Sequence, residues 1–82
     1  MILKIERQKQ IDYGEEGSTI LITEIYQGNN FKFDGTTATI GNDNVLLTSY
    51  DSLDEITNNF IHYETLNAYL MNNEGKTIER II

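Results

Sequence analysis

The sequence predicts an α+β fold: an antiparallel meander sheet of about five or six strands, with one principal amphipathic helix packed on it. Two observations predict this fold. Before residue 51, short segments rich in β-branched and aromatic residues alternate with turn clusters of Gly, Asn and Asp. From residue 52 onward, the apolar residues take the spacing of a helix. At 82 residues the chain is expected to form a single domain, residues 1–82.

The first two predicted strands lie on either side of a glycine-containing turn. In residues 3–11, LKIERQKQI, apolar residues of one parity surround Arg7 and Lys9, which indicates a strand with a buried start and a solvated middle. Residues 12–18, DYGEEGS, are expected to form the turn. Residues 19–26, TILITEIY, carry apolar side chains at both parities, which is typical of a central strand covered on both faces.

Three further short strands are expected, separated by turns: residues 31–33, 36–40 and 45–50. The pair Asp34-Gly35 is a favoured hairpin sequence, because both central residues of a type I′ turn need positive φ angles. Residues 41–44, GNDN, are expected to form the next turn, since Asn and Asp tolerate a left-handed backbone. Strands joined by such short turns must be antiparallel neighbours, so a meander is the simplest topology.

A helix is expected from about residue 52 to residue 62, and its pattern can be continued to residue 71. Ser52 and Glu55 have the three-residue spacing of a capping box. Asp54 adds a second carboxylate to the first turn, where the positive end of the helix dipole favours anions. Apolar residues follow at helical spacing: Leu53, Ile56 and Phe60.

The last part of the chain supports two interpretations. Residues 68–82, AYLMNNEGKTIERII, also fit two strands around the turn NNEG, and residues 77–82 fit a strand in either case. The sequence therefore leaves residues 64–71 open between helix and strand.

The middle of the chain is strongly acidic. The net charge of −7 divides into +2 for residues 1–9, −10 for residues 10–75 and +1 for residues 76–82. Phosphate backbones and anionic membrane surfaces should repel such a body, so neither direct nucleic-acid binding nor membrane binding is expected. A protein partner with a basic surface should be attracted to it.

Catalysis and cofactor binding lack most of the residues they need. Without Cys there are no disulfides, thiolate metal sites or thiol nucleophiles, and with His62 as the single His there is no visible base for a nucleophile. The EGKT of residues 74–77 lacks the first Gly of a P-loop, and the HYE of residues 62–64 lacks the Pro-Cys-x-x-Cys half of a deaminase signature. We therefore expect no enzymatic activity, no cofactor and no metal. The absence of Cys and of a signal-peptide core favours the cytoplasm.

These observations predict a small acidic protein that binds other proteins or regulates them without catalysis. It could also form a homodimer, with the first strand paired to a copy of itself across a two-fold axis. The alternative is an inhibitor of the kind made by phages and mobile elements, which docks on a basic host protein by imitating nucleic-acid charge. The candidate partner-binding residues are acidic side chains and one tyrosine: Asp43, Asp51, Asp54, Glu55, Glu64 and Tyr69.

Overall fold

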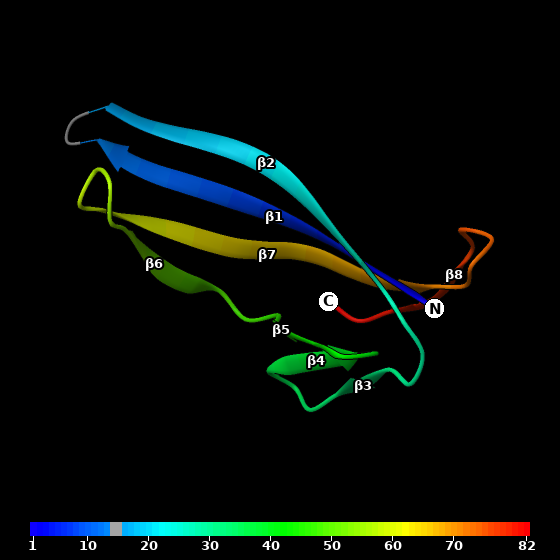
Figure 1. Cartoon of the computed structure of the whole chain (residues 1–82). Coiled ribbons are helices and arrows are strands. Elements are labelled where there is room, and N and C mark those ends of the chain that lie inside the picture. Colours follow the sequence, from blue (N-terminus) through cyan, green and yellow to red (C-terminus); the bar gives the residue numbers. More distant parts are fainter. Residues whose placement is uncertain (14–15) are drawn as a thin grey trace.

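Eight strands build the computed structural model, which describes residues 1–13 and 16–82 (Figure 1). The strands are β1 (Ile2–Tyr13), β2 (Glu16–Gln27), β3 (Lys32–Phe33), β4 (Thr37–Ile40), β5 (Asp43–Leu46), β6 (Tyr50–Asp54), β7 (Asn59–Met71) and β8 (Thr77–Arg80). A five-stranded sheet has the order β2-β1-β7-β6, with β8 also paired to β7, and a three-stranded sheet has the order β3-β4-β5. All of these pairings are antiparallel.

Strand β7 organises the larger sheet. It pairs with β1 over most of its length, with β6 near its start and with β8 near its end. The register between β1 and β7 shifts between Glu6 and Arg7, so that Leu66 is the extra residue of a β-bulge. In Figure 1 the smaller sheet lies near the end of the larger sheet where both chain termini lie, whereas the β6–β7 turn is at the other end.

The hydrophobic core lies between the two sheets. Its fully or almost fully buried members are Leu3, Ile5, Ala38, Ile40, Val45, Leu47 and Ala68. In β1 the core-facing residues have odd numbers, because successive side chains of a strand point to opposite faces. Arg7 continues that series and is buried as well, so the expectation of a solvated middle for this strand is wrong at Arg7.

Two glycines allow the chain to pass from the larger sheet to the smaller one. The N–H of Gly28 donates to the carbonyl of Met1 at 3.1 Å, and the N–H of Gly41 donates to the carbonyl of Asn29 at 2.8 Å. A Cβ added to Gly28 would lie 2.8 Å from the Cα of Gly41, closer than side-chain carbons approach backbone atoms. The two backbones can therefore meet here only because no side chain separates them.

The predicted helix over residues 52–62 is wrong, and the fold is all-β instead of α+β. No helix occurs in the part of the chain that the structure describes. Residues 50–54 form β6 and residues 59–71 form β7, so residues 64–71 are strand. The two-strand interpretation of the last fifteen residues is confirmed, with β8 as the second strand.

The residues that suggested a helix start form a hairpin instead. Ser52 lies in β6 opposite Ile61 of β7, so it does not cap a helix N-terminus. Asn58 takes a φ of 58°, and its N–H donates to the carbonyl of Asp54 at 2.7 Å, which closes the turn. The physical reason is long-range pairing, because β7 gains backbone hydrogen bonds to β1 on one side and to β6 on the other.

Two topological expectations are also wrong. The chain does not form one meander, because β1 lies between β2 and β7, which are far apart in sequence. Strand β2, expected at the centre because of its apolar residues, is an edge strand of the larger sheet. Both sides of β1 carry partners within the chain, so β1 has no open edge in this structure for pairing with a second copy.

The predicted positions of the turns agree with the structure better than the predicted helix does. A hairpin turn at Asp34-Gly35 is confirmed between β3 and β4, but its predicted type I′ form is wrong: Gly35 has a φ of 96°, whereas Asp34 does not have a positive φ and its N–H donates to the carbonyl of Thr37. The turn predicted over residues 41–44 is confirmed at Gly41 and Asn42, with Gly41 and not an Asn or Asp at positive φ (58°), whereas Asp43 and Asn44 already belong to β5. The centre of the turn predicted for residues 12–18 lies outside the described residues.

Candidate functional site

Four of the six predicted partner-binding residues come together on the β6–β7 hairpin: Asp51, Asp54, Glu55 and Glu64. Asp51 lies opposite His62, and Glu64 is two residues further along β7, so Asp51 and Glu64 share one face of the sheet. Asp54 alternates to the other face, and Glu55 is exposed in the turn. Asp51, Asp54 and Glu55 thus lie toward the end of the sheet that carries the β6–β7 turn, whereas Glu64 lies near the middle of β7, just beyond its pairing with β6.

The other two predicted residues lie elsewhere. Asp43 starts β5 in the smaller sheet, opposite Ile40. Tyr69 lies in β7 between Lys4 of β1 and Arg80 of β8, and the Arg80 guanidinium is 5.8 Å from the centre of its ring. Tyr69 therefore has basic neighbours at the end of the sheet that lies away from the carboxylates, so the six residues do not form one surface.

Two of the hairpin carboxylates make hydrogen bonds within the hairpin. Asp51 Oδ1 is 2.7 Å from His62 Nδ1 across the two strands, and both side chains are exposed. Asp54 Oδ1 accepts the N–H of Ile56 at 3.0 Å, which supports the turn. Exposed ion pairs contribute little to stability, typically about 0–1 kcal/mol. The Asp51–His62 contact is therefore weak enough for a partner's side chain to replace it.

Exposed apolar side chains at the same end were missed by the sequence analysis. Leu53 is 48% exposed, Ile56 is 95% exposed and Phe60 is 65% exposed. Leu53 and Phe60 lie directly opposite each other on the face that carries Asp51 and Glu64, while Ile56 is in the turn. We call this set the hairpin patch: Asp51, Leu53, Glu55, Ile56, Phe60 and Glu64.

The middle of the larger sheet holds an ion pair between the buried Arg7 and the half-buried Glu24. The Arg7 guanidinium also donates to Thr65 Oγ1 at 2.7 Å and to the carbonyl of Leu46 at 2.6 Å, and it lies 5.5 Å from the centre of the Tyr50 ring. Leu46 belongs to β5, so Arg7 links the two sheets directly. Among the described residues no buried side-chain nitrogen or oxygen lacks a hydrogen-bond partner.

Tyrosines surround this ion pair. Tyr26 donates its hydroxyl to Glu24 Oε1 at 2.7 Å, and burial together with that carboxylate raises the pKa of Tyr26 to about 12. The Tyr50 ring stacks on Tyr63 at 4.9 Å between centroids and 17° between planes, and burial raises the pKa of Tyr50. Tyrosines with raised pKa values remain protonated at neutral pH, so this cluster has the character of a polar core and not of a catalytic base.

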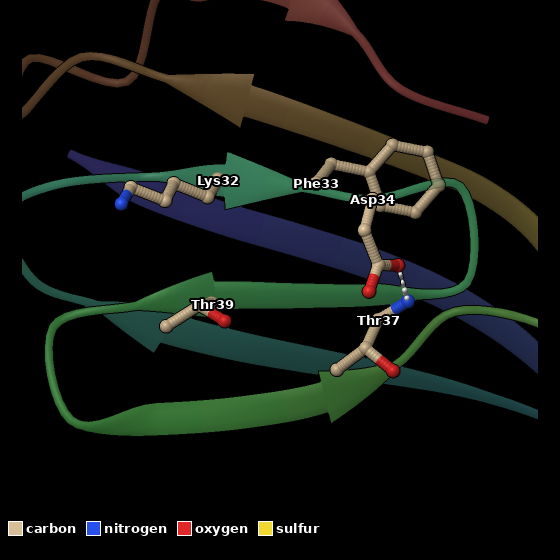
Figure 2. Close-up of a pocket in the computed structure, with 5 residues that line it drawn as sticks. All are labelled: Lys32, Phe33, Asp34, Thr37 and Thr39. Carbon is tan, nitrogen blue, oxygen red and sulfur yellow. Dashed lines mark hydrogen bonds between the residues drawn. The ribbon is translucent and has the colours of Figure 1, made fainter.

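An open depression lies on β3 and β4 (Figure 2). Its lining residues are Lys32, Phe33, Asp34, Thr37 and Thr39. Asp34 Oδ1 accepts the N–H groups of Thr36 at 2.9 Å and Thr37 at 2.7 Å, and these bonds lower the pKa of Asp34. Figure 2 shows the Lys32 side chain pointing away from that carboxylate. Asp34 thus serves the turn, and the depression offers no converging reactive groups.

No cluster of three or more metal-ligating side chains occurs among residues 1–13 and 16–82. Over the same residues, no helix has the length and apolar character required to cross a membrane. Comparisons with known proteins add no relative: no family model matches the chain, and searches of curated proteins and of solved structures found nothing similar. The function must therefore be inferred from the surface itself.

Proposed function

We propose that this is a non-enzymatic binding protein whose hairpin patch docks on a protein with an apolar pocket bordered by Lys and Arg side chains. The observation that carries the proposal is the joint exposure of Leu53, Ile56 and Phe60 at one end of the sheet. Apolar side chains scattered singly over a surface need no explanation, but a group of them rimmed by polar residues is typical of an interaction site. Phe60 is the natural anchor, since aromatic side chains, Phe included, are enriched in the cores of interfaces.

Charge defines the chemistry of the partner. Residues 33–75 contain no Lys or Arg, and Asp51, Glu55 and Glu64 belong to the patch itself. A basic rim on the partner would pair with these carboxylates and accelerate association at low salt. The apolar side chains would supply the salt-insensitive part of the affinity.

Nucleic-acid mimicry receives less support than apolar docking. A mimic needs carboxylates in rows at about the 6–7 Å spacing of phosphates along one strand. Of the five predicted acids, Asp51 and Glu64 share a face of the sheet, Asp54 faces the other way and Asp43 lies in the smaller sheet. That distribution favours a compact patch over rows of carboxylates at phosphate spacing.

The test compares variants of the patch with matched variants elsewhere. Ile56→Ser with Phe60→Ser removes the apolar part, and Ile78→Ser removes an apolar side chain of β8 that is also exposed. Each immobilised protein captures partners from a lysate of its own organism, followed by quantitative mass spectrometry. We expect one basic protein to be captured by the wild type and by Ile78→Ser, and to be reduced at least tenfold by the double variant.

The captured protein is then purified and titrated against the same variants by calorimetry at two salt concentrations. Asp51→Asn with Glu64→Gln should weaken binding mainly at low salt, whereas Asp43→Asn in the smaller sheet should not. Equal affinity of all variants for the purified partner would contradict the proposal, as would loss of binding by Ile78→Ser to the same extent as by the patch variant.

A further inference from the structure

The outer edge of β2 is the longest open edge of the larger sheet. In the part of the chain that the structure describes, no strand pairs with that side of β2. The register of β2 with β1 runs through twelve residue pairs without a bulge. Proteins usually block such edges with Lys, Pro or bulges, because unpaired backbone N–H and C=O groups recruit another strand. Residues 19–27 of β2 contain neither Lys nor Pro.

The side chains of β2 also match a β-strand partner. Leu21 is 73% exposed and Ile25 is 65% exposed, and they lie on one face with Thr23 between them. Ile20, on the other face, is exposed as well. Apart from Thr23, these are apolar β-strand formers, and cross-strand contacts would remove part of their apolar surface from water if a strand were added beside β2.

We propose that β2 pairs with β2 of a second copy of the chain, antiparallel and about a two-fold axis at Thr23. This register places Leu21 opposite Ile25 of the partner subunit, and Ile25 opposite the partner's Leu21. On the other face it places Ile20 opposite Tyr26 of the partner subunit. The two larger sheets then become one continuous sheet, and the two-fold symmetry closes the assembly at a dimer.

The charges of the edge permit this pairing. Glu24 is the acidic residue within residues 19–27, and Arg7 already neutralises it inside each subunit. In the proposed register Glu24 faces the partner's Ile22, so the two Glu24 carboxylates are not directly opposed. The acidic hairpin patches lie on β6 and β7, and β6 is at the opposite edge from β2, so their mutual repulsion across the dimer is screened by distance and salt. The inference is independent of the proposed docking function.

A single engineered cysteine tests the axis directly, because the native chain contains no Cys. Opposed residues of antiparallel strands have Cα atoms about 4.5–5.5 Å apart, within the range of a disulfide. Under a mild oxidant, Thr23→Cys should form a covalent dimer on a non-reducing gel. Thr19→Cys is the matched control, since its two copies would lie about 26 Å apart along the strands. Equal cross-linking of both variants, or no cross-linking of Thr23→Cys, would refute the register.

Charge variants at the two most exposed positions test the pairing in solution. Leu21→Lys with Ile25→Lys places like charges opposite each other in the dimer, whereas Leu21→Lys with Ile25→Glu places opposite charges together. By sedimentation equilibrium we expect about twice the 9.4 kDa chain mass for the wild type and for the Lys/Glu variant. The dissociation constant of the dimer should be at least tenfold higher for the Lys/Lys variant than for the wild type. A monomeric wild type, or equal dissociation of both variants, would overturn the inference.

Discussion

Replacing Arg7 with Met tests whether one buried guanidinium joins the two sheets. Arg7 binds Glu24 and Thr65 in the larger sheet and the carbonyl of Leu46 in the smaller one. Breaking a buried ion pair by removing one partner costs about 3–5 kcal/mol. We expect about 3 kcal/mol, the lower end of that range, because the Glu24 side chain is 26% exposed and can recover water. For an 82-residue domain the total free energy of unfolding is about 4–12 kcal/mol.

The assay is urea unfolding followed by far-UV circular dichroism at one fixed protein concentration. With a slope of about 1–1.5 kcal/mol per molar urea, Arg7→Met should lower the midpoint by about 2–3 M. The double variant Arg7→Met with Glu24→Leu should recover at least half of the loss, because it no longer leaves a carboxylate without its cation. A midpoint of Arg7→Met within about 0.5 M of the wild-type midpoint would refute this account of Arg7. So would a double variant whose loss of unfolding free energy equals the sum of the losses in the two single variants.

Three further predictions address the backbone and the tyrosines. Gly28→Ala should destabilise the protein by about 1–3 kcal/mol, because its Cβ would meet the Gly41 backbone, and its thermal midpoint should fall. The folded state keeps the Tyr26 proton up to a pKa of about 12, against 10.0 for the ordinary side chain, so the free energy of unfolding should fall as the pH rises from about 10 to about 12. Urea unfolding across that pH range should show a smaller loss in Tyr26→Phe. Asn58→Gly should be tolerated, whereas Asn58→Val should cost about 1–2 kcal/mol at a φ of 58°, again read from urea unfolding.

Local signals predicted local structure well. The two turns between β3, β4 and β5 each need a residue that accepts a positive φ angle, and the structure has Gly35 and Gly41 in that role. Such turns are decided within four or five residues, so neighbouring sequence is sufficient to find them. The strands predicted over residues 31–33 and 36–40 correspond to β3 and β4, whereas the one predicted over residues 45–50 is wrong in its bounds, because β5 ends at Leu46 and β6 begins at Tyr50.

The helix was predicted wrongly because its pattern fits two structures. A spacing of seven places Leu53 and Phe60 on one side of a helix, and it also places them opposite each other across a short hairpin turn. The choice depends on β1, which supplies ten residue pairs to β7 from the other end of the sequence. Asn58, with its left-handed backbone, was the local signal that favoured the hairpin.

The candidate site was predicted only in part, for the same reason. Acidic residues were identified from charge, and four of them do lie on the β6–β7 hairpin. Leu53, Ile56 and Phe60 were assigned to a buried helix stripe, so their exposure could not be foreseen. Arg7 was expected in solvent because it is charged, although its parity with Leu3 and Ile5 placed it on the buried face. The alternation of side chains along β1 therefore predicts the burial of Arg7 better than its charge does.

The hairpin patch and the proposed dimer edge of β2 can be occupied at the same time. Strands β2 and β6 are opposite edges of one sheet, so a dimer formed through β2 leaves both hairpin patches uncovered. Antiparallel pairing directs the two patches to opposite ends of an assembly of molecules that are each 42 Å long. A partner with one pocket should then bind the wild type and the Lys/Lys variant of β2 with the same intrinsic Kd. A partner that displays several pockets should bind the dimer more tightly through avidity, and that gain should vanish in the variant. A changed intrinsic Kd for the one-pocket partner would mean that the β2 edge belongs to the docking surface itself.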